Sequence, residues 1–316
     1  MAKHENWASG MKEAAAFAPC HITGLFQIFD QSADALHVGS IGAGVSLSLG
    51  TRTVVNVKEK ARPSVKININ NHPARTAQVS KRVVNTFLSR LSGMQKEKCE
   101  ITVEHHVEMP IGAGFGTSGA AALSLAFALN KAFEVGMSKT EVAQIAHVAE
   151  VECKTGLGTV IAEMFGGLEA RLKPGAPGVG EIKRIPTSEK TVVACLSFGP
   201  LSTRKFLTDK AVHTRINRFG GRLTSEMAAN PDAGNFMKLS RDFAEHVGLI
   251  TEKVRRVLKE TDQTGIVCSM PMFGESVFTV TEEENLDQIL RVFHEHGSNG
   301  QTIISKVDVK GARILQ

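Results

Sequence analysis

The chain has 316 residues, of which 42 % are hydrophobic and 22 % are charged, and its formal net charge is +5. This length predicts two domains or one large domain with ample core material. The basic residues are dispersed, which argues against a dedicated nucleic-acid surface, and the five separated cysteines lack the spacing of a disulfide framework or a zinc site.

The beginning of the chain carries no sign of a targeting segment. Residues 1–17 contain Lys3, Glu5, Lys12 and Glu13 and no sustained apolar run, so we expect no signal peptide. The uncharged stretch 109–130 has too many glycines and hydroxyls in its first half for a lipid-facing helix. We therefore expect a cytoplasmic protein with no membrane partner.

In the first half of the chain, strand patterns alternate with helix patterns. The segments 45–57 and 64–70 alternate β-branched and polar residues around a turn, which predicts an antiparallel hairpin. Ser138 and Glu141 form the sequence signature of a capping box. We expect strands over 14–22, 45–57, 64–70 and 100–107, and a further strand that follows the glycines at 166–167 and ends at 172. We expect helices over 76–91, 118–133 and 138–152.

Proline and glycine cluster at 174–180, and a second turn signal follows at 186–188. This composition predicts a boundary between a domain at 1–188 and a domain at 189–316. The second half reads as α+β, with an antiparallel sheet covered by helices on one face. We expect strands over 191–197, 265–270, 275–281 and 302–309, and helices over 205–228, 235–257 and 283–297.

A glycine-rich segment leads from a polar strand into an alanine-rich helix at 109–123. Glycines let the backbone approach a ligand closely, and the unpaired N–H groups of a helix N-terminus attract phosphate. No lysine follows the glycines, so the common phosphate loop is excluded, and the alternating Gly112, Gly114 and Gly116 fit a dinucleotide fingerprint poorly. A helix start whose glycines only relieve crowding is the plainer alternative, but the added Thr117 and Ser118 favour nucleotide binding.

This segment resembles the second motif of the GHMP kinases, the superfamily of galactokinase and of homoserine, mevalonate and phosphomevalonate kinases. From Pro110 it reads Pro-x-x-x-Gly-Phe-Gly-Thr-Ser-Gly-Ala. Ala18–Gly24 is similar to the first motif of that family, and Gly265–Gly274 stands where the third motif falls. The resemblance implies a two-domain α+β fold, with an N-terminal domain like ribosomal protein S5 domain 2 and a C-terminal ferredoxin-like α/β sandwich.

Within the superfamily, four stretches resemble the archaeal pantoate kinases: Ala18–Ile28, Gly39–Val45, Thr155–Gly158 and Met272–Phe278. This resemblance implies an ATP-dependent kinase that phosphorylates the primary hydroxyl of pantoate on the archaeal route to coenzyme A. It also implies a homodimer, although no interface can be read from the sequence.

The resemblance assigns ATP and Mg²⁺ as cofactors. Ser118 matches a magnesium-bound hydroxyl, with plain helix capping as the alternative. Glu150 and Glu152 are both close to the position of the metal-binding glutamate, and we favour Glu150 because it shares a helix face with small residues. The expected nucleotide-binding residues are Pro110, Gly112, Ala113, Gly114, Phe115, Gly116, Thr117, Ser118, Gly119 and Ala120.

The expected catalytic residues are His21, Ser118, Glu150 and Thr159. His21 stands where many members of the superfamily have a lysine or arginine, and it could contact phosphate or substrate or shuttle a proton. At Thr159 several members have an aspartate that acts as base. Threonine cannot replace a carboxylate base, so we expect catalysis by positioning and charge stabilisation, with the proton passing to the phosphate or to His21.

A carboxylate substrate requires a cation or backbone N–H groups together with polar side chains. We expect substrate contacts from His21, Ser40, Gly42, Gly44, Arg52, Gly156 and Gly158. Further candidates, which the sequence cannot rank, are Arg62, Arg75, Arg171 and Arg204. His105 and His106 read as strand surface, because no third metal ligand has a recognisable spacing.

Two alternatives stay open. One is a GHMP kinase of another specificity, such as homoserine, whose ammonium group would call for a carboxylate in the site. The other is a catalytically silent nucleotide-binding regulator that kept the fold after losing the aspartate at position 159.

Overall fold

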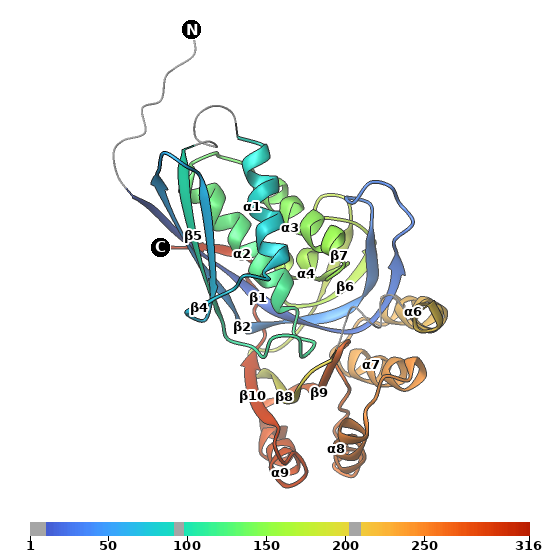
Figure 1. Ribbon diagram of the computed structural model, residues 1–316. Helices are drawn as coiled ribbons and strands as arrows, with labels where there is room; N and C mark the ends of the chain where they lie inside the picture. The colour runs from blue at the N-terminus through green and yellow to red at the C-terminus, as the bar shows by residue number, and fades with distance from the viewer. Residues whose placement is uncertain (1–10, 92–97, 202–209) are drawn as a thin grey trace.

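The computed structural model describes residues 11–91, 98–201 and 210–316, and it has a mixed α/β architecture (Figure 1). The strands of this part of the chain form two separate sheets. The larger follows the order β11-β1-β2-β5-β3-β4. Strand β6 pairs with β2 at Gly42–Val45, near the N-terminal end of β2, and β7 pairs with β6. Its strands are β1 (Lys12–Phe29), β2 (Gly39–Glu59), β3 (Ser64–Ile69), β4 (His72–Pro73), β5 (Cys99–Val107), β6 (Leu168–Lys173), β7 (Glu181–Ile185) and β11 (Arg313–Leu315).

The predicted hairpin between 45–57 and 64–70 is wrong. Strand β5 lies between its two arms, antiparallel to β2 and parallel to β3. The error has a physical reason, because strand order depends on which segment returns to pair, and the local alternation of residues carries no information about that choice.

Four helices lie together on one face of the larger sheet: α1 (Gln78–Ser89), α2 (Thr117–Ala132), α3 (Lys139–Cys153) and α4 (Thr159–Phe165) (Figure 1). Helix α2 is buried on nearly all sides, which explains its richness in alanine and leucine. The predicted capping box of α3 is present, with Ser138 and Glu141 each bonding the other's backbone N–H.

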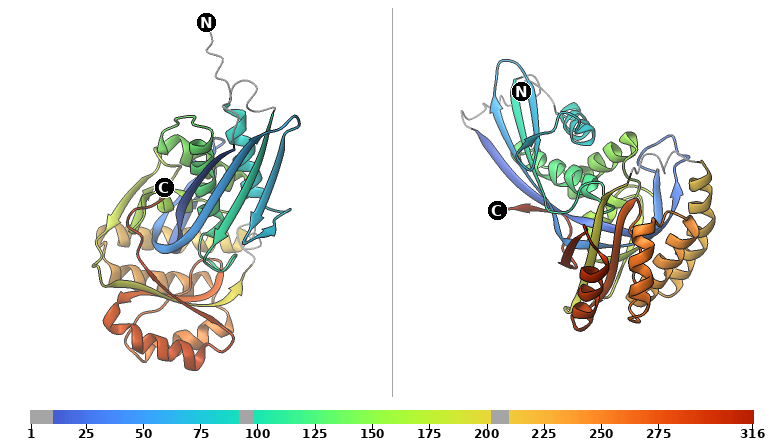
Figure 2. Two further views of the ribbon diagram at one scale, coloured as in Figure 1. Left: turned by 90° about the vertical axis from the view of Figure 1, so that its left-hand side faces the viewer. Right: turned by 60° about the horizontal axis from the view of Figure 1, so that its bottom comes forward.

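The second sheet is antiparallel, has the order β10-β8-β9, and is covered by helices, as predicted (Figures 1 and 2). The expected helix 235–257 is two helices, because Gly248 takes φ = 73° and ends the first. The segment 265–270 is not a strand, and a single bridge joins Ser269 to Phe278. The elements are β8 (Thr191–Pro200), α6 (Lys210–Ala229), α7 (Ala233–Val247), α8 (Glu252–Asp262), β9 (Gly274–Glu282), the 3₁₀ turn η1 (Glu283–Asn285), α9 (Leu286–His296) and β10 (Gln301–Lys306).

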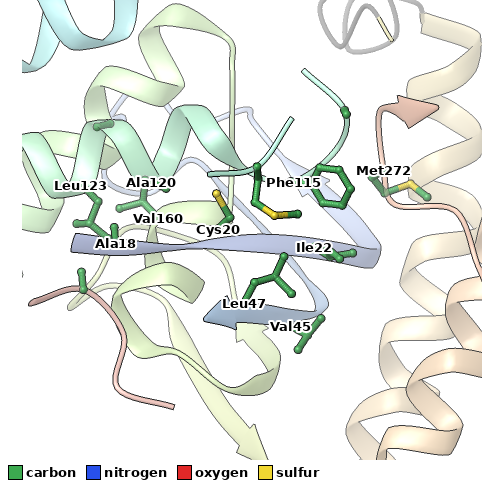
Figure 3. Packing of buried hydrophobic residues seen from close by; sticks show 14 of the residues in the cluster. Ala18, Cys20, Ile22, Val45, Leu47, Phe115, Ala120, Leu123, Val160 and Met272 are labelled. Carbon is green, nitrogen blue, oxygen red and sulfur yellow. The ribbon is translucent and has the colours of Figure 1, made fainter. Parts of the chain in front are cut away.

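The core runs without a break from one sheet to the other. Figure 3 shows β1 between the start of α2 and strand β2, with Cys20 beneath Ala120 and with Met272 beside Phe115. The chain leaves the larger sheet after β7 and returns to it with β11, which pairs with β1. The boundary between 1–188 and 189–316 stays a prediction. In the described part of the chain, no helix has the length and apolarity needed to cross a bilayer.

Candidate active site

A pocket of about 240 Å³ opens where β1, the glycine-rich loop, the turn between α3 and α4, and the Met272–Phe273 segment meet. The expected site residues that line this pocket are His21, Ser40, Gly112, Gly114, Phe115, Gly116, Thr117, Ser118, Glu150, Gly156, Gly158 and Thr159. Residues far apart in the sequence therefore converge on one cavity. The lining residues that were not named individually from the sequence are Thr23, Phe26, Ile111, Thr155, Leu157, Met272 and Phe273, although all seven lie in the stretches that carry the family resemblance.

The glycine-rich loop has the backbone conformation that its glycines suggest. Gly112, Gly114 and Gly116 take φ values of 77°, 87° and 64°, a region that other residues avoid. The backbone N–H of His21 donates to the carbonyl of Phe115 at 3.0 Å, which ties the loop to β1. Helix α2 begins directly after Gly116 and has no side-chain cap, so its first N–H groups are available to an anion.

Ser118 does not cap α2. Its hydroxyl donates to Oε1 of Glu150 at 2.5 Å, and Thr155 donates to the same oxygen at 2.7 Å. Burial raises the pKa of Glu150, against the effect of these two hydrogen bonds. A Cβ on Gly156 would lie 2.4 Å from Oε2 of Glu150, so the glycine leaves the space that this carboxyl occupies. A buried carboxylate and a hydroxyl at the uncapped start of α2 form a hard oxygen donor set.

These donors fit Mg²⁺. The ion keeps several waters and takes one or two carboxylates together with substrate phosphates, so a cluster of three acidic or histidine ligands is not required, and the described residues contain none. Glu150 is 2 % exposed and reaches the pocket, whereas Glu152 is exposed and pairs with Arg82. The geometry therefore favours Glu150 over Glu152 as the residue that would hold the metal.

His21 is buried, with Nε2 2.8 Å from Oε1 of Glu169 and Nδ1 3.3 Å from the hydroxyl of Thr23. Arg171 Nη1 donates to the same oxygen of Glu169. The Nε and Nη2 atoms of Arg171 are buried without a hydrogen-bond partner in the described residues. A Cβ on Gly158 would lie 2.2 Å from the Ser40 hydroxyl and 3.1 Å from Nε of Arg171, so this guanidinium lies directly behind the pocket wall.

Several expected contacts lie outside the pocket. Arg52 is exposed on β2 opposite Phe17, so the structure does not bring it to the site, and Arg62 and Arg75 are also exposed. Arg204 lies outside the described residues. Gly42 and Gly44 belong to the paired part of β2, where their missing side chains make room for β1. Pro110, Ala113, Gly119 and Ala120 support the loop and do not line the cavity.

Thr159 begins α4 at the edge of the pocket, and no carboxylate replaces the missing aspartate at that position. Glu163, one turn further along α4, is fully buried with its carboxyl against Gly116 and Gly119. Burial raises the pKa of Glu163 well above its ordinary value, and the charge of Glu150 adds to this effect. The sequence offered one signal for the two charged residues beside His21. Glu169 and Arg171 alternate with apolar residues along a strand, so their side chains share one face.

Comparison with known proteins indicates the family of the chain. Residues 78–167 match the model of the GHMP kinases N terminal domain. The chain is 33 % identical to the pantoate kinase of Methanocaldococcus jannaschii, over 87 % of this chain and 96 % of that protein. It is 32 % identical to the pantoate kinase of Methanospirillum hungatei, over 90 % of this chain and 92 % of that protein.

Solved structures are similar along the whole chain. A protein described as a phosphotransferase related to the coenzyme A biosynthesis pathway has a TM-score of 0.85 and 28 % identity, and the match covers 96 % of this chain and 98 % of that one. A homoserine kinase from Cytophaga hutchinsonii has a TM-score of 0.71 at 14 % identity, over the full length of both chains, which shows a shared fold.

Proposed function

The chain belongs to the GHMP kinase family, and from this premise we propose that it transfers the γ-phosphoryl group of ATP to the primary hydroxyl of pantoate, forming 4-phosphopantoate. A kinase of this family uses ATP as its cosubstrate. The observation that carries the choice of acceptor is the buried guanidinium of Arg171 directly behind the pocket, two of whose nitrogens have no hydrogen-bond partner among the residues that the structure describes. The pantoate kinases among its relatives support the same choice.

The donor end of the reaction rests on the uncapped start of α2. We propose that its N–H groups and those of the Gly112–Gly116 loop bind the phosphates. Ser118 and Glu150 would hold Mg²⁺, which neutralises charge on the transferring group when bound. Phosphoryl transfer requires mainly such positioning and charge stabilisation, and these groups would supply both.

The acceptor end rests on the opposite wall. Pantoate carries one carboxylate and two hydroxyl groups, and it has no cationic group. Arg171 would attract the carboxylate from behind Gly158, and the Ser40 hydroxyl would donate a hydrogen bond to it. A buried cation beside a polar hydroxyl suits an anionic alcohol of this size.

Homoserine is the main rival acceptor, and its ammonium group requires a carboxylate that is free to pair. Glu150 is the one carboxylate among the residues that line the pocket, and it is assigned to Mg²⁺. Glu169 pairs with His21 and Arg171 through Oε1 and does not line the pocket. This arrangement favours an acceptor without an ammonium group. In a silent nucleotide-binding regulator, the two unpaired nitrogens of Arg171 would have no acceptor to bind, which is unfavourable for a buried guanidinium.

A panel of alcohols with coupled detection of ADP tests the proposal. Pantoate, homoserine and mevalonate are compared at equal ATP and Mg²⁺ concentrations, with an assay without acceptor as the control. We expect kcat/KM for pantoate to exceed the other values by at least about a hundredfold, because an unpaired buried polar group discriminates strongly between substrates. Good turnover of another alcohol without turnover of pantoate would defeat the choice of substrate. ATP binding without any product would favour the regulator.

A coenzyme A role, a cytoplasmic location and a homodimer are further parts of this proposal. The mass of the particle in solution, measured by light scattering, tests the dimer directly.

A further inference from the structure

Strand β1 is irregular on both sides of the segment from His21 to Thr23. Its pairing with β2 shifts register between Pro19 and His21 and again between Thr23 and Leu25. Such irregularities redirect side chains and are frequent next to active sites. Because His21 and Thr23 are two residues apart on a strand, their side chains lie on the same face. The segment between the two shifts therefore presents an imidazole and a hydroxyl together.

Gly44 allows His21 to reach across β2. It pairs with Thr23 on β1 and with Glu169 on β6, so it lies between the strands that carry the two groups. A Cβ on Gly44 would lie 2.3 Å from Cε1 and 2.4 Å from Nε2 of His21, closer than any real contact. The imidazole passes over this glycine to Glu169. Gly44 was predicted to contact the substrate. Its missing side chain leaves the space that the His21 ring occupies.

The polarity of these hydrogen bonds follows from the chemistry of the groups. The carboxylate of Glu169 accepts from Arg171 and also from His21, so we assign the hydrogen of the ring to Nε2. Burial lowers the pKa of His21 below its ordinary value, and this effect outweighs the opposing effect of Glu169. The ring is therefore neutral at pH 7, Nδ1 has a free lone pair, and the Thr23 hydroxyl donates to it at 3.3 Å.

The Thr23 oxygen therefore remains an acceptor at the pocket wall, where a substrate hydroxyl requires one. Both residues line the pocket, but the His21 side chain is fully buried whereas Thr23 is partly exposed, so the Thr23 hydroxyl is the more accessible of the two to a substrate. Thr23 is also held near the glycine loop, because the Met272 N–H donates to its carbonyl at 3.2 Å and the His21 N–H donates to Phe115. The Thr23 hydroxyl belongs to the same pocket as the proposed phosphate site and the wall formed by Ser40 and Gly158.

We propose that Thr23 accepts the hydrogen of the substrate hydroxyl and relays a proton to His21, whose ring Glu169 orients. This inference rests on the proposed kinase function. The substrate oxygen forms a bond to the γ-phosphorus, and the bond between that phosphorus and the bridging oxygen breaks, its electron pair leaving with ADP. The substrate proton passes to Oγ1 of Thr23 as the proton of Thr23 passes to Nδ1 of His21. The imidazolium, paired with Glu169, later returns the proton through Thr23 to a water that enters the pocket after the product has left.

Thr159 lacks the carboxylate that would accept the substrate proton, and Thr23 takes this role. The charged groups that face the His21 ring are Glu169 and Arg171, both on β6. Glu150 on α3 and Glu163 on α4 face the Gly156 and Gly116 turns. Glu169 is a positioning residue, since it acts through His21.

Thr23→Val and Thr23→Ser form a matched pair, because the first removes the hydroxyl at nearly equal volume and the second keeps it. We expect Thr23→Val to lower kcat about a hundredfold with the KM for ATP unchanged, as for loss of acid–base assistance. Thr23→Ser should restore kcat to within about threefold of the wild type on the same scale. Thr51→Val, at a buried threonine of β2 outside the pocket, controls for the loss of a hydroxyl from the sheet.

The pH profile separates a relay from a structural role. In the wild type, kcat should fall as the pH drops through the lowered pKa of His21, because protonated Nδ1 cannot accept. Thr23→Val should lose this acid limb, and Gly44→Ala, which displaces the ring, should lower kcat in the same way. The relay is overturned if Thr23→Ser is as impaired as Thr23→Val, or if Thr23→Val keeps both kcat and the acid limb. If the wild type prefers another alcohol, the substrate assignment fails, and the same variants test the relay on that alcohol.

Discussion

Two serines of α2 lie six residues apart and have different roles. Ser118 bonds to Glu150 at the pocket, whereas Ser124 is fully buried and bonds to the Ala120 carbonyl at 2.7 Å and to the Thr53 hydroxyl at 2.6 Å. A hydroxyl that binds a ligand and a hydroxyl that satisfies the interior should respond differently to removal.

We therefore expect Ser118→Ala to lower kcat about a hundredfold while the free energy of unfolding changes by less than about 1 kcal/mol. Ser124→Ala is the matched control in the same helix. It should cost about 1–2 kcal/mol of stability, because it leaves polar partners unsatisfied, and it should keep turnover. Steady-state kinetics and chemical denaturation measure both effects. Equal losses of stability with turnover retained in Ser118→Ala would reduce Ser118 to a structural role.

At the scale of the elements, His105 on β5 was expected at the strand surface, and this expectation is wrong. The residue is fully buried, with Nδ1 2.7 Å from the Thr53 hydroxyl of β2 and Nε2 3.0 Å from the Ser80 hydroxyl of α1. Its sequence neighbours are polar, but β5 runs between β2 and β3 with one face under the helices. One imidazole thus joins three elements.

Burial lowers the pKa of His105 to about 4. Between pH 6.5 and pH 4, His105 binds a proton in the unfolded chain but not in the folded chain. Its full contribution to the free energy of unfolding is therefore present above this range and is lost as the pH drops through it. The pKa difference between the two states corresponds to up to about 3 kcal/mol of this free energy. We expect His105→Gln to reduce the loss of unfolding free energy between pH 7 and pH 4.5, measured by denaturant titration. His72→Gln, at an exposed histidine of β4, should leave the slope unchanged. Equal slopes in the wild type and His105→Gln would contradict the assignment.

The elements that the sequence predicted well are those specified by local signals. The capping box at Ser138 and the apolar face of α1, with Val83 and Phe87 buried, needed no knowledge of distant residues. Strand order and lateral contacts are different, because they depend on non-local pairing. The contact of His21 with Glu169 exists because Gly44 stands between them in register, and no spacing along the chain reveals that register. The residues of the glycine loop and His21 could therefore be named from the sequence, whereas Arg171 could not be ranked and Glu169 was not identified.

For the whole molecule, the pocket depends on both sheets. The Leu201 N–H donates to the Gly112 carbonyl at 3.2 Å, and the Ser276 hydroxyl donates to the Ala113 carbonyl at 3.1 Å. Gly274 lies so close to the glycine loop that a Cβ there would be 1.9 Å from the Ala113 carbonyl oxygen. The second sheet thus supports the loop that we propose binds phosphate, and the two halves should unfold together.

The last ten residues of the chain return to the larger sheet through Asp308. Its side chain accepts from the Lys310 and Gly311 N–H groups at 2.9 and 2.7 Å and from Arg313 at 2.8 Å, and its carbonyl accepts from Gly167. Arg313 lies over the Phe17 ring at 4.4 Å and belongs to β11, which pairs with β1. Loss of the Asp308 side chain would leave backbone donors and Arg313 without their partner.

We expect Asp308→Ala to lower the free energy of unfolding by about 2–4 kcal/mol, because a nearly buried, hydrogen-bonded carboxylate is removed. Lys310→Ala, at an exposed neighbour, should change it by less than about 0.5 kcal/mol. If β11 joins the halves into one cooperative unit, calorimetry of Asp308→Ala should show one transition at a lower temperature than in the wild type. Both sheets pack on the same core, so weakening this contact destabilises them together. Two separate transitions in the wild type would show instead that the sheets unfold independently and that Asp308 stabilises only the end of the chain.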